Sequence, residues 1–284
     1  MIPKNELEFY KRQGVRTKVR LGTFDGFPKD VYAISKIIQH LLIHPAHLYL
    51  YNIKMPEKRI NDGKRRNLQD SLSQIRKFGN KPLTEYREPK DRVVNTCRQY
   101  AMFMCSVLRE QGIPARCRCG FAIYFRSGWF MDHWICEYWD KKKKRWIRVD
   151  AQIDDIQALE LHINREVIDF TNLPKDAFFP AGILWKLYRQ GLVDGNLCGY
   201  PHIKGETGAW YIRGNMLRDF FALNKTEYLY QEVSKLMDKD YNPNREELLL
   251  LDEIADLTIN IDENFNKFLD FSKDREKHLK PKNN

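Results

Sequence analysis

The stretch that decides the fold runs from residue 92 to residue 155. It reads RVVNTCRQYAMFMCSVLREQGIPARCRCGFAIYF over residues 92–125 and DHWICEYWDKKKKRWIRVDAQIDD over residues 132–155. Asn95 or Thr96 can cap a helix that runs to about residue 111, where Gly112 and Pro114 end it. Alternation of apolar and polar residues then predicts three strands, over residues 115–125, 133–139 and 145–150.

The first of these strands is expected to be half buried. Cys117 and Cys119 share one face with further apolar residues, whereas Arg116 and Arg118 occupy the other face. The two later strands form a hairpin, because a short lysine-rich turn over residues 140–144 joins them.

Cys97 opens the predicted helix, and this position suits a reactive thiol. The amide N–H groups of a first helical turn lack helical partners and carry partial positive charge, which favours a thiolate and can stabilise an oxyanion. The flanking residues 95–99 are otherwise polar. A lone cysteine is, however, more often a small core residue.

His133 and Asp150 complete a possible catalytic set with Cys97. A tight hairpin places Asp150 opposite or diagonal to His133, within reach across two neighbouring strands. The carboxylate can then hold the imidazole while the other ring nitrogen faces the thiol. Taken singly, His133 can also be a structural strand residue and Asp150 a strand-end cap.

These residues resemble the transglutaminase-like superfamily. The likeness lies in Cys97, in the GIPAR segment at residues 112–116, in Asp132-His133-Trp134, and in Trp146 with Val149-Asp150-Ala151, over about residues 30–155. The downstream segments FPAG at 179–182, GAWYIRGN at 208–215 and RD at 218–219 resemble bacterial proteins that carry this core with an added C-terminal region.

The resemblance implies an α+β, papain-like core in which the nucleophile helix packs on an antiparallel sheet. It implies Cys97 as nucleophile, His133 as general acid/base and Asp150 as the residue that orients His133. The superfamily also takes a second oxyanion donor from a helix well before the cysteine, and Gln39 is our candidate beside the Cys97 backbone. A surface glutamine is the alternative interpretation of Gln39.

The function that we expect is cysteine-dependent acyl transfer or amide hydrolysis through a thioester, on a protein or peptide amide. Trp129, Trp134 and Trp210 are candidate substrate-binding walls, although aromatic residues are core residues by default. A cysteine protease, a peptide or glycoprotein amidase, and a non-catalytic binding module of the same fold remain alternatives. The sequence leaves open whether water or an amine resolves the thioester.

Composition and charge limit the classes of binding partner that we expect. The chain has 48 Lys and Arg against 38 Asp and Glu, for a net charge of +10, which leaves open an acidic partner. No zinc-finger spacing or basic-aromatic motif indicates nucleic acid. Apolar runs are too short for a bilayer and the amino terminus lacks a signal-peptide pattern, so we expect no membrane partner and a cytoplasmic location.

We expect neither a metal nor a cofactor. Three histidines over residues 40–47 recur at helical spacing, but Pro45 interrupts the geometry. Cys117 and Cys119 could join His133 and Cys136 in a zinc site, yet the spacing of the first two is unlike that of a zinc knuckle. We therefore interpret these cysteines as core thiols.

The chain divides into three expected segments. Residues 1–29 are predicted to form an N-terminal arm, residues 30–155 the transglutaminase-like core, and residues 156–284 a mainly helical C-terminal region packed on the core. The helices expected outside the central stretch begin after Asp30 and cover residues 68–78, 178–189, 215–223, 225–237, 246–259 and 263–272.

Overall fold

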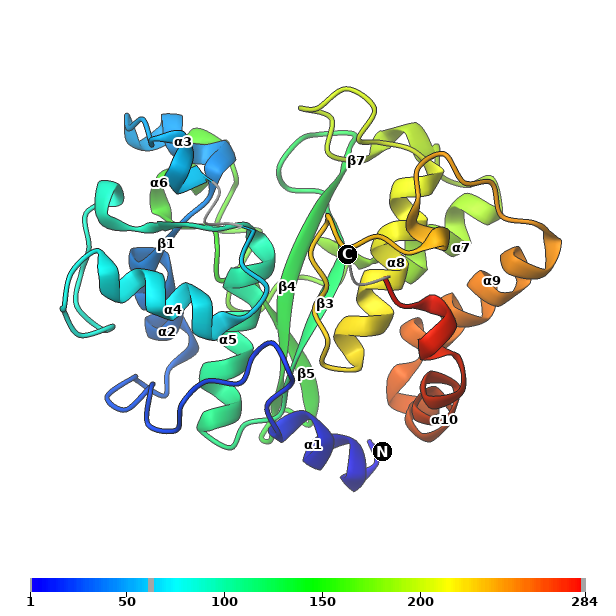
Figure 1. The fold of residues 1–284 in the computed structure, drawn as a ribbon, viewed down its shortest axis with the longest axis horizontal. Coiled ribbons are helices and arrows are strands. Elements are labelled where there is room, and N and C mark those ends of the chain that lie inside the picture. Colours follow the sequence, from blue (N-terminus) through cyan, green and yellow to red (C-terminus); the bar gives the residue numbers. More distant parts are fainter. Residues whose placement is uncertain (1, 61–63, 282–284) are drawn as a thin grey trace. The chain divides into compact units, whose positions relative to one another are not determined.

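The computed structural model describes residues 2–60 and 64–281 of the chain. Within these residues the chain forms two compact units, whose elements Figure 1 draws in sequence colours. The N-terminal unit consists of Glu8–Cys117 and Trp134–Pro174, and the C-terminal unit of Met1–Leu7, Arg118–His133 and Lys175–Asn284. The three segments expected from the sequence have other boundaries, and that segmentation stays a prediction.

The N-terminal unit is built mainly from helices that precede the sheet. Its 3-10 helices are η1 (Pro45–Tyr51) and η3 (Pro89–Asp91), and a small parallel pair joins β1 (Leu42–Ile43) to β2 (Val93–Val94). Its α-helices are α2 (Val31–Leu41), α3 (Glu57–Ile60), α4 (Leu68–Lys77), α5 (Cys97–Glu110) and α6 (Asp155–Glu160). The chain begins with α1 (Lys4–Lys11), where the sequence suggests only an arm.

Local signals explain where α2 begins and what it packs against. Asp30 is the N-cap residue, and its carboxylate accepts a hydrogen bond from the Ala33 amide at 2.8 Å. The apolar stripe of α2 is buried, with Ile34 and Ile38 fully covered, and the helix packs against α5. The predicted helix after Asp30 is therefore confirmed.

Helix α5 has the predicted bounds but is more deeply buried than its apolar stripe suggests. Gly112 adopts a left-handed conformation (φ 78°) after the helix, as a C-terminal glycine should. Arg98 and Arg109 are buried as well, because backbone carbonyls accept their hydrogen bonds, Arg66 O at 2.7 Å and Ala115 O at 2.8 Å respectively.

In the described part of the chain, five strands form one sheet in the order β5-β4-β3-β6, with β7 paired to β4. Neighbours β4 and β5 are antiparallel, as are β3 and β6, whereas β7 runs parallel to β4. The strands are β3 (Ala115–Ala122), β4 (Phe130–Asp140), β5 (Arg145–Val149), β6 (Phe178–Pro180) and β7 (Cys198–Gly199). Cys105 of α5 contacts the sulfur atoms of Cys117 and Cys136, both at 3.3 Å, so α5 packs on this sheet.

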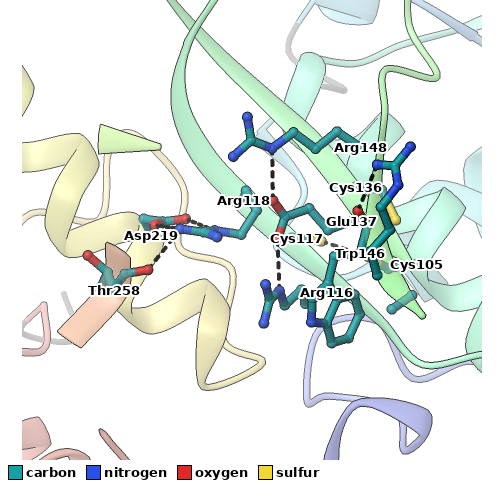
Figure 2. Close-up of polar contacts among 12 residues, drawn as sticks. Cys105, Arg116, Cys117, Arg118, Cys136, Glu137, Trp146, Arg148, Asp219 and Thr258 are labelled. Atoms are coloured by element: carbon teal, nitrogen blue, oxygen red, sulfur yellow. Dashed lines mark hydrogen bonds and ion pairs between the residues drawn. The ribbon is translucent and has the colours of Figure 1, made fainter. Parts of the chain in front are cut away.

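Strand β3 is buried on both faces, so the expectation of a half-buried strand was wrong. Arg116 and Arg118 are each only 3% exposed. Figure 2 shows the reason: Glu137 accepts from Arg116 Nε at 2.8 Å, and Asp219 accepts from Arg118 Nε at 2.9 Å. A buried guanidinium needs a carboxylate partner of this kind.

The C-terminal unit is mainly helical, as predicted. Its helices are α7 (Ala181–Arg189), α8 (Ala209–Leu223), α9 (Arg245–Ile259) and α10 (Ile261–Leu279), with η4 (Gly195–Leu197) and η5 (Lys235–Met237). In Figure 1, α8 is yellow and α9 is orange, and α7 packs against both.

Four elements of the C-terminal unit differ from the prediction, and one of them is α10, which runs to Leu279 rather than to residue 272. Residues 178–180 form β6 rather than the start of a helix, because they pair with β3. Helix α8 begins at Ala209, six positions before the predicted start at 215. Residues 225–237 form no α-helix and contain only η5, since this segment contributes its polar groups to tertiary contacts such as that between Tyr230 O and Arg218. The overall α+β architecture is nevertheless confirmed.

Candidate active site

Cys97 is the first residue of α5. The preceding residue, Thr96, has an extended backbone (φ −91°, ψ 171°), and its hydroxyl donates to Gln99 Oε1 at 2.9 Å. The Cys97 side chain is only 4% exposed and forms no disulfide. The thiol thus lies at the positive end of a helix dipole and is largely screened from water, which strengthens that dipole's influence on a thiolate.

Asp150 directly follows β5 and is held by the backbone. Its amide N–H donates to Phe170 O at 2.9 Å, and its Oδ1 accepts from the Gln152 amide at 2.8 Å. The β4–β5 register runs from Asp140 opposite Arg145 to Cys136 opposite Val149, so Asp150 comes one residue after the last paired position. The residue is 1% exposed. Asp150 is therefore a fixed, buried acceptor at the end of a hairpin strand.

His133 lies in β4 and is enclosed by aromatic rings. The centroid of its ring is 4.9 Å from that of Phe125 and 6.1 Å from that of Tyr124, both in edge-on geometry. His133 is 2% exposed. Such packing restricts the rotation of the imidazole, which is useful for a residue that must transfer a proton in one direction.

Two of the predicted site residues line one cavity in the N-terminal unit. Gln39 and Asp150 both line it, and its volume is about 140 Å³. Gln39 Nε2 donates to Ile153 O at 3.0 Å, whereas Gln39 Oε1 has no partner among the described residues. At the same cavity, Lys36 pairs with Asp155 at 2.6 Å. The lining residues are Tyr32, Ser35, Lys36, Gln39, Asp150, Ile153, Arg165, Ile168, Asp169, Phe170 and Thr171.

Comparison with known families decides the class of this fold. The family model of the transglutaminase-like superfamily matches residues 60–151, roughly a third of the chain. This segment is a transglutaminase-like core. The superfamily is generally enzymatic and uses a cysteine for acyl transfer or hydrolysis. Comparisons with curated proteins and with solved structures give no match.

The match assigns the core but leaves individual roles open. Cys97, His133 and Asp150 lie inside the matched segment of the transglutaminase-like core, whereas Gln39 and the C-terminal helices lie outside it. In the described residues, no helix combines the length and the apolar character that a membrane crossing needs.

The three candidate substrate-binding tryptophans have different surroundings. Trp134 is 1% exposed and belongs to the hydrophobic core. Trp129 is half-buried and lies under the Arg126 guanidinium at 4.8 Å, and half-buried Trp210 donates to Thr207 O at 2.9 Å. Their role in substrate binding stays a prediction.

The remaining thiols of the transglutaminase-like core are buried residues. Burial raises the pKa of Cys105 and of Cys136, and it raises the pKa of Cys198, in the C-terminal unit, to about 12. At neutral pH these groups are protonated and react slowly. Among the described residues, no group of three or more metal-binding side chains has an arrangement that could hold an ion.

A hydrogen-bond network that sequence reasoning missed surrounds Asp132, the residue before His133. Asp132 accepts from Asn215 Nδ2 at 2.6 Å and from the Tyr211 hydroxyl at 3.2 Å, both on α8. Burial raises the pKa of Asp132, although hydrogen bonds from Tyr230 and Asn215 oppose that change. Helix α8 therefore anchors the stretch of β4 that carries His133. The partners lie about 80 residues downstream, where spacing alone carries no signal.

Proposed function

We propose that this protein is a cysteine acyltransferase or amide hydrolase, with Cys97 as nucleophile. The thiolate of Cys97 attacks the carbonyl carbon of an amide, forming a C–S bond. The C–N bond then breaks, and His133 gives its proton to the leaving amine. Water or a second amine attacks the thioester, passes a proton to His133 and releases an acid or a new amide with the thiolate restored.

The observation that carries this proposal is the position of Cys97 at the first residue of a buried helix within a transglutaminase-like core. The helix terminus supplies the electrostatic environment that a nucleophilic thiol requires. The other cysteines whose pKa is raised by burial lack such a position.

Strand geometry supports Asp150 as the residue that orients His133. Every second side chain of a strand points to the same face, so His133 and Glu137, four positions apart in β4, share a face. Glu137 is opposite Arg148 in the register, and Arg148 in turn shares a face with Asp150. In this proposal Asp150 accepts from one ring nitrogen and leaves the other directed at the thiol.

The proposed oxyanion donors are the Cys97 backbone N–H and the Gln39 side-chain amide. Gln39 is 5% exposed, and its Nε2 keeps a second proton after donating to Ile153 O. Trp129, Trp134 and Trp210 are proposed to contact the acyl donor. The irregular cysteine spacing supports a cytoplasmic location, and the net charge of +10 supports an acidic partner.

Chemical labelling tests the nucleophile. We expect iodoacetamide at neutral pH to label Cys97 ahead of the other five cysteines, as located by peptide mass spectrometry. Cys97→Ala should abolish the fast labelling, and Cys198→Ala, the matched control with a high-pKa thiol, should leave it unchanged. Equal labelling of several cysteines would remove the case for an activated thiol.

Turnover separates the enzyme from a non-catalytic binding module of the same fold. We expect ammonia release from glutamine-containing peptides, and His133→Ala should lower the rate by about 10²- to 10⁴-fold. A peptide library with and without an added amine then distinguishes amine transfer from proteolysis or amidase activity. A folded protein that neither labels at Cys97 nor releases ammonia would be a binding module.

A further inference from the structure

Asn95 is a buried amide whose hydrogen-bonding groups are unused. It is 0% exposed, and neither Oδ1 nor Nδ2 has a partner among the described residues. Most buried polar side chains in folded proteins are paired, because an unpaired donor or acceptor loses its hydration without compensation. An unpaired amide in this position therefore needs an explanation other than fold stability.

The backbone fixes where Asn95 lies with respect to the nucleophile. Its own N–H donates to Ile43 O at 2.9 Å, which continues the β1–β2 pairing by one residue. Thr96 is extended, so the side chains on either side of it, Asn95 and Cys97, project from the same side of the chain. Two residues of extended chain span at most about 7 Å between Cα atoms.

We infer that Asn95 Nδ2 is a donor of the oxyanion hole, acting together with the Cys97 backbone N–H. This inference rests on the proposed function, since it requires a tetrahedral oxyanion at Cys97. When the thiolate adds to the carbonyl carbon, the carbonyl π pair moves to oxygen, and the two N–H groups stabilise that charge until the C–N bond breaks. Gln39 Nε2 keeps one proton for the same oxygen, because the other already binds Ile153 O, whereas both protons of Asn95 Nδ2 are unused within the described part of the chain.

Two reactions of the same thiol separate this role from a structural one. Acylation by p-nitrophenyl acetate passes through a tetrahedral oxyanion, whereas alkylation by iodoacetamide displaces iodide at a saturated carbon without one. We expect Asn95→Ala to slow acylation by about 10²- to 10³-fold and to change alkylation less than about twofold. Ser71→Ala is the matched control, because Ser71 is also 0% exposed with a hydroxyl that has no partner, and both rates should persist.

A second variant guards against a folding defect. Asn95→Leu keeps the branched shape of the side chain and removes the unpaired amide, so it should melt no lower than the wild type while losing acylation as Asn95→Ala does. Wild-type protein that is never acylated overturns the proposed function, and the role of Asn95 with it. Acylation of Asn95→Ala at the wild-type rate overturns the role of Asn95 alone.

Discussion

Removing the Asp219 carboxylate should destabilise the protein more than any surface substitution. Asp219 is 0% exposed and accepts hydrogen bonds from Arg118 Nε at 2.9 Å, Arg118 Nη2 at 2.8 Å and the Cys119 amide at 2.9 Å. Asp219→Ala leaves the Arg118 charge buried, with Thr258 O at 3.2 Å as a neutral acceptor (Figure 2). Breaking a buried pair of this kind costs about 3–5 kcal/mol.

Urea denaturation followed by tryptophan fluorescence measures this loss. The matched control is Asp270→Ala, which removes an ion pair with Lys273 whose two side chains are 75% and 73% exposed, and it should cost less than about 0.5 kcal/mol. The double variant Arg118→Met/Asp219→Leu should recover at least about half of the loss, because no uncompensated charge stays buried. Equal, small losses for Asp219→Ala and Asp270→Ala would refute this account of β3.

Two further predictions concern a helix cap and a close backbone contact. Burial alone raises the pKa of Glu247, but the Asn244 amide, Lys235 and Tyr241 outweigh it and lower that pKa. The ionised Glu247 carboxylate thus stabilises the fold fully above the ordinary carboxyl range, and this contribution is lost as the pH falls. The difference in melting temperature between wild type and Glu247→Gln should therefore close from about pH 6 to about pH 3, and a constant difference would contradict this. Gly120→Ala would drive Cβ into the backbone oxygen of Phe179, so we expect a loss of at least about 2 kcal/mol in urea denaturation; unchanged stability would contradict the β3–β6 pairing.

Local signals made much of the fold predictable from the sequence. Asp30 predicts the start of α2 and Gly112 predicts the end of α5, because capping residues act within a few positions of a helix end. The hairpin of β4 and β5 follows from alternation and a short turn. Burial of Arg118 was not predictable, since its partner Asp219 lies 101 positions away.

The same limit of locality applies to helix α8 and the segment after it. Gly214 lowers the helix propensity of the first half of α8, and a Cβ there would lie 2.9 Å from Nη1 of Arg218, one turn further along the same helix. The sequence predicts a helix over residues 225–237. In the structure this segment forms no α-helix: Glu227 is fully buried, and Tyr230 O accepts a hydrogen bond from Arg218. In residues 225–237, tertiary contacts therefore override the helical propensity.

The prediction of the candidate site, which stays a prediction, rests on a different kind of signal. Cys97 could be singled out because the start of a helix is a local feature of the sequence. The sequence could not show which of the polar residues beside Cys97 have hydrogen-bond partners. Arg98 and Gln99 both donate to backbone carbonyls, Arg66 O and Arg65 O, so their burial serves the fold. Asn95 is buried beside them without such a partner, and only coordinates separate these cases.

Buried polar groups of this chain thus fall into two kinds, which should respond to mutation with opposite signs. Asp219 is satisfied, so removing it costs stability through the Arg118 charge it leaves behind. Asn95 is unsatisfied, so replacing it with Leu should cost no stability, because its hydration is already lost in the folded state. Stability lost at a site that activity requires is a recurrent feature of enzymes. Asn95→Leu that melts well below wild type would place Asn95 with Asp219 as a structural group.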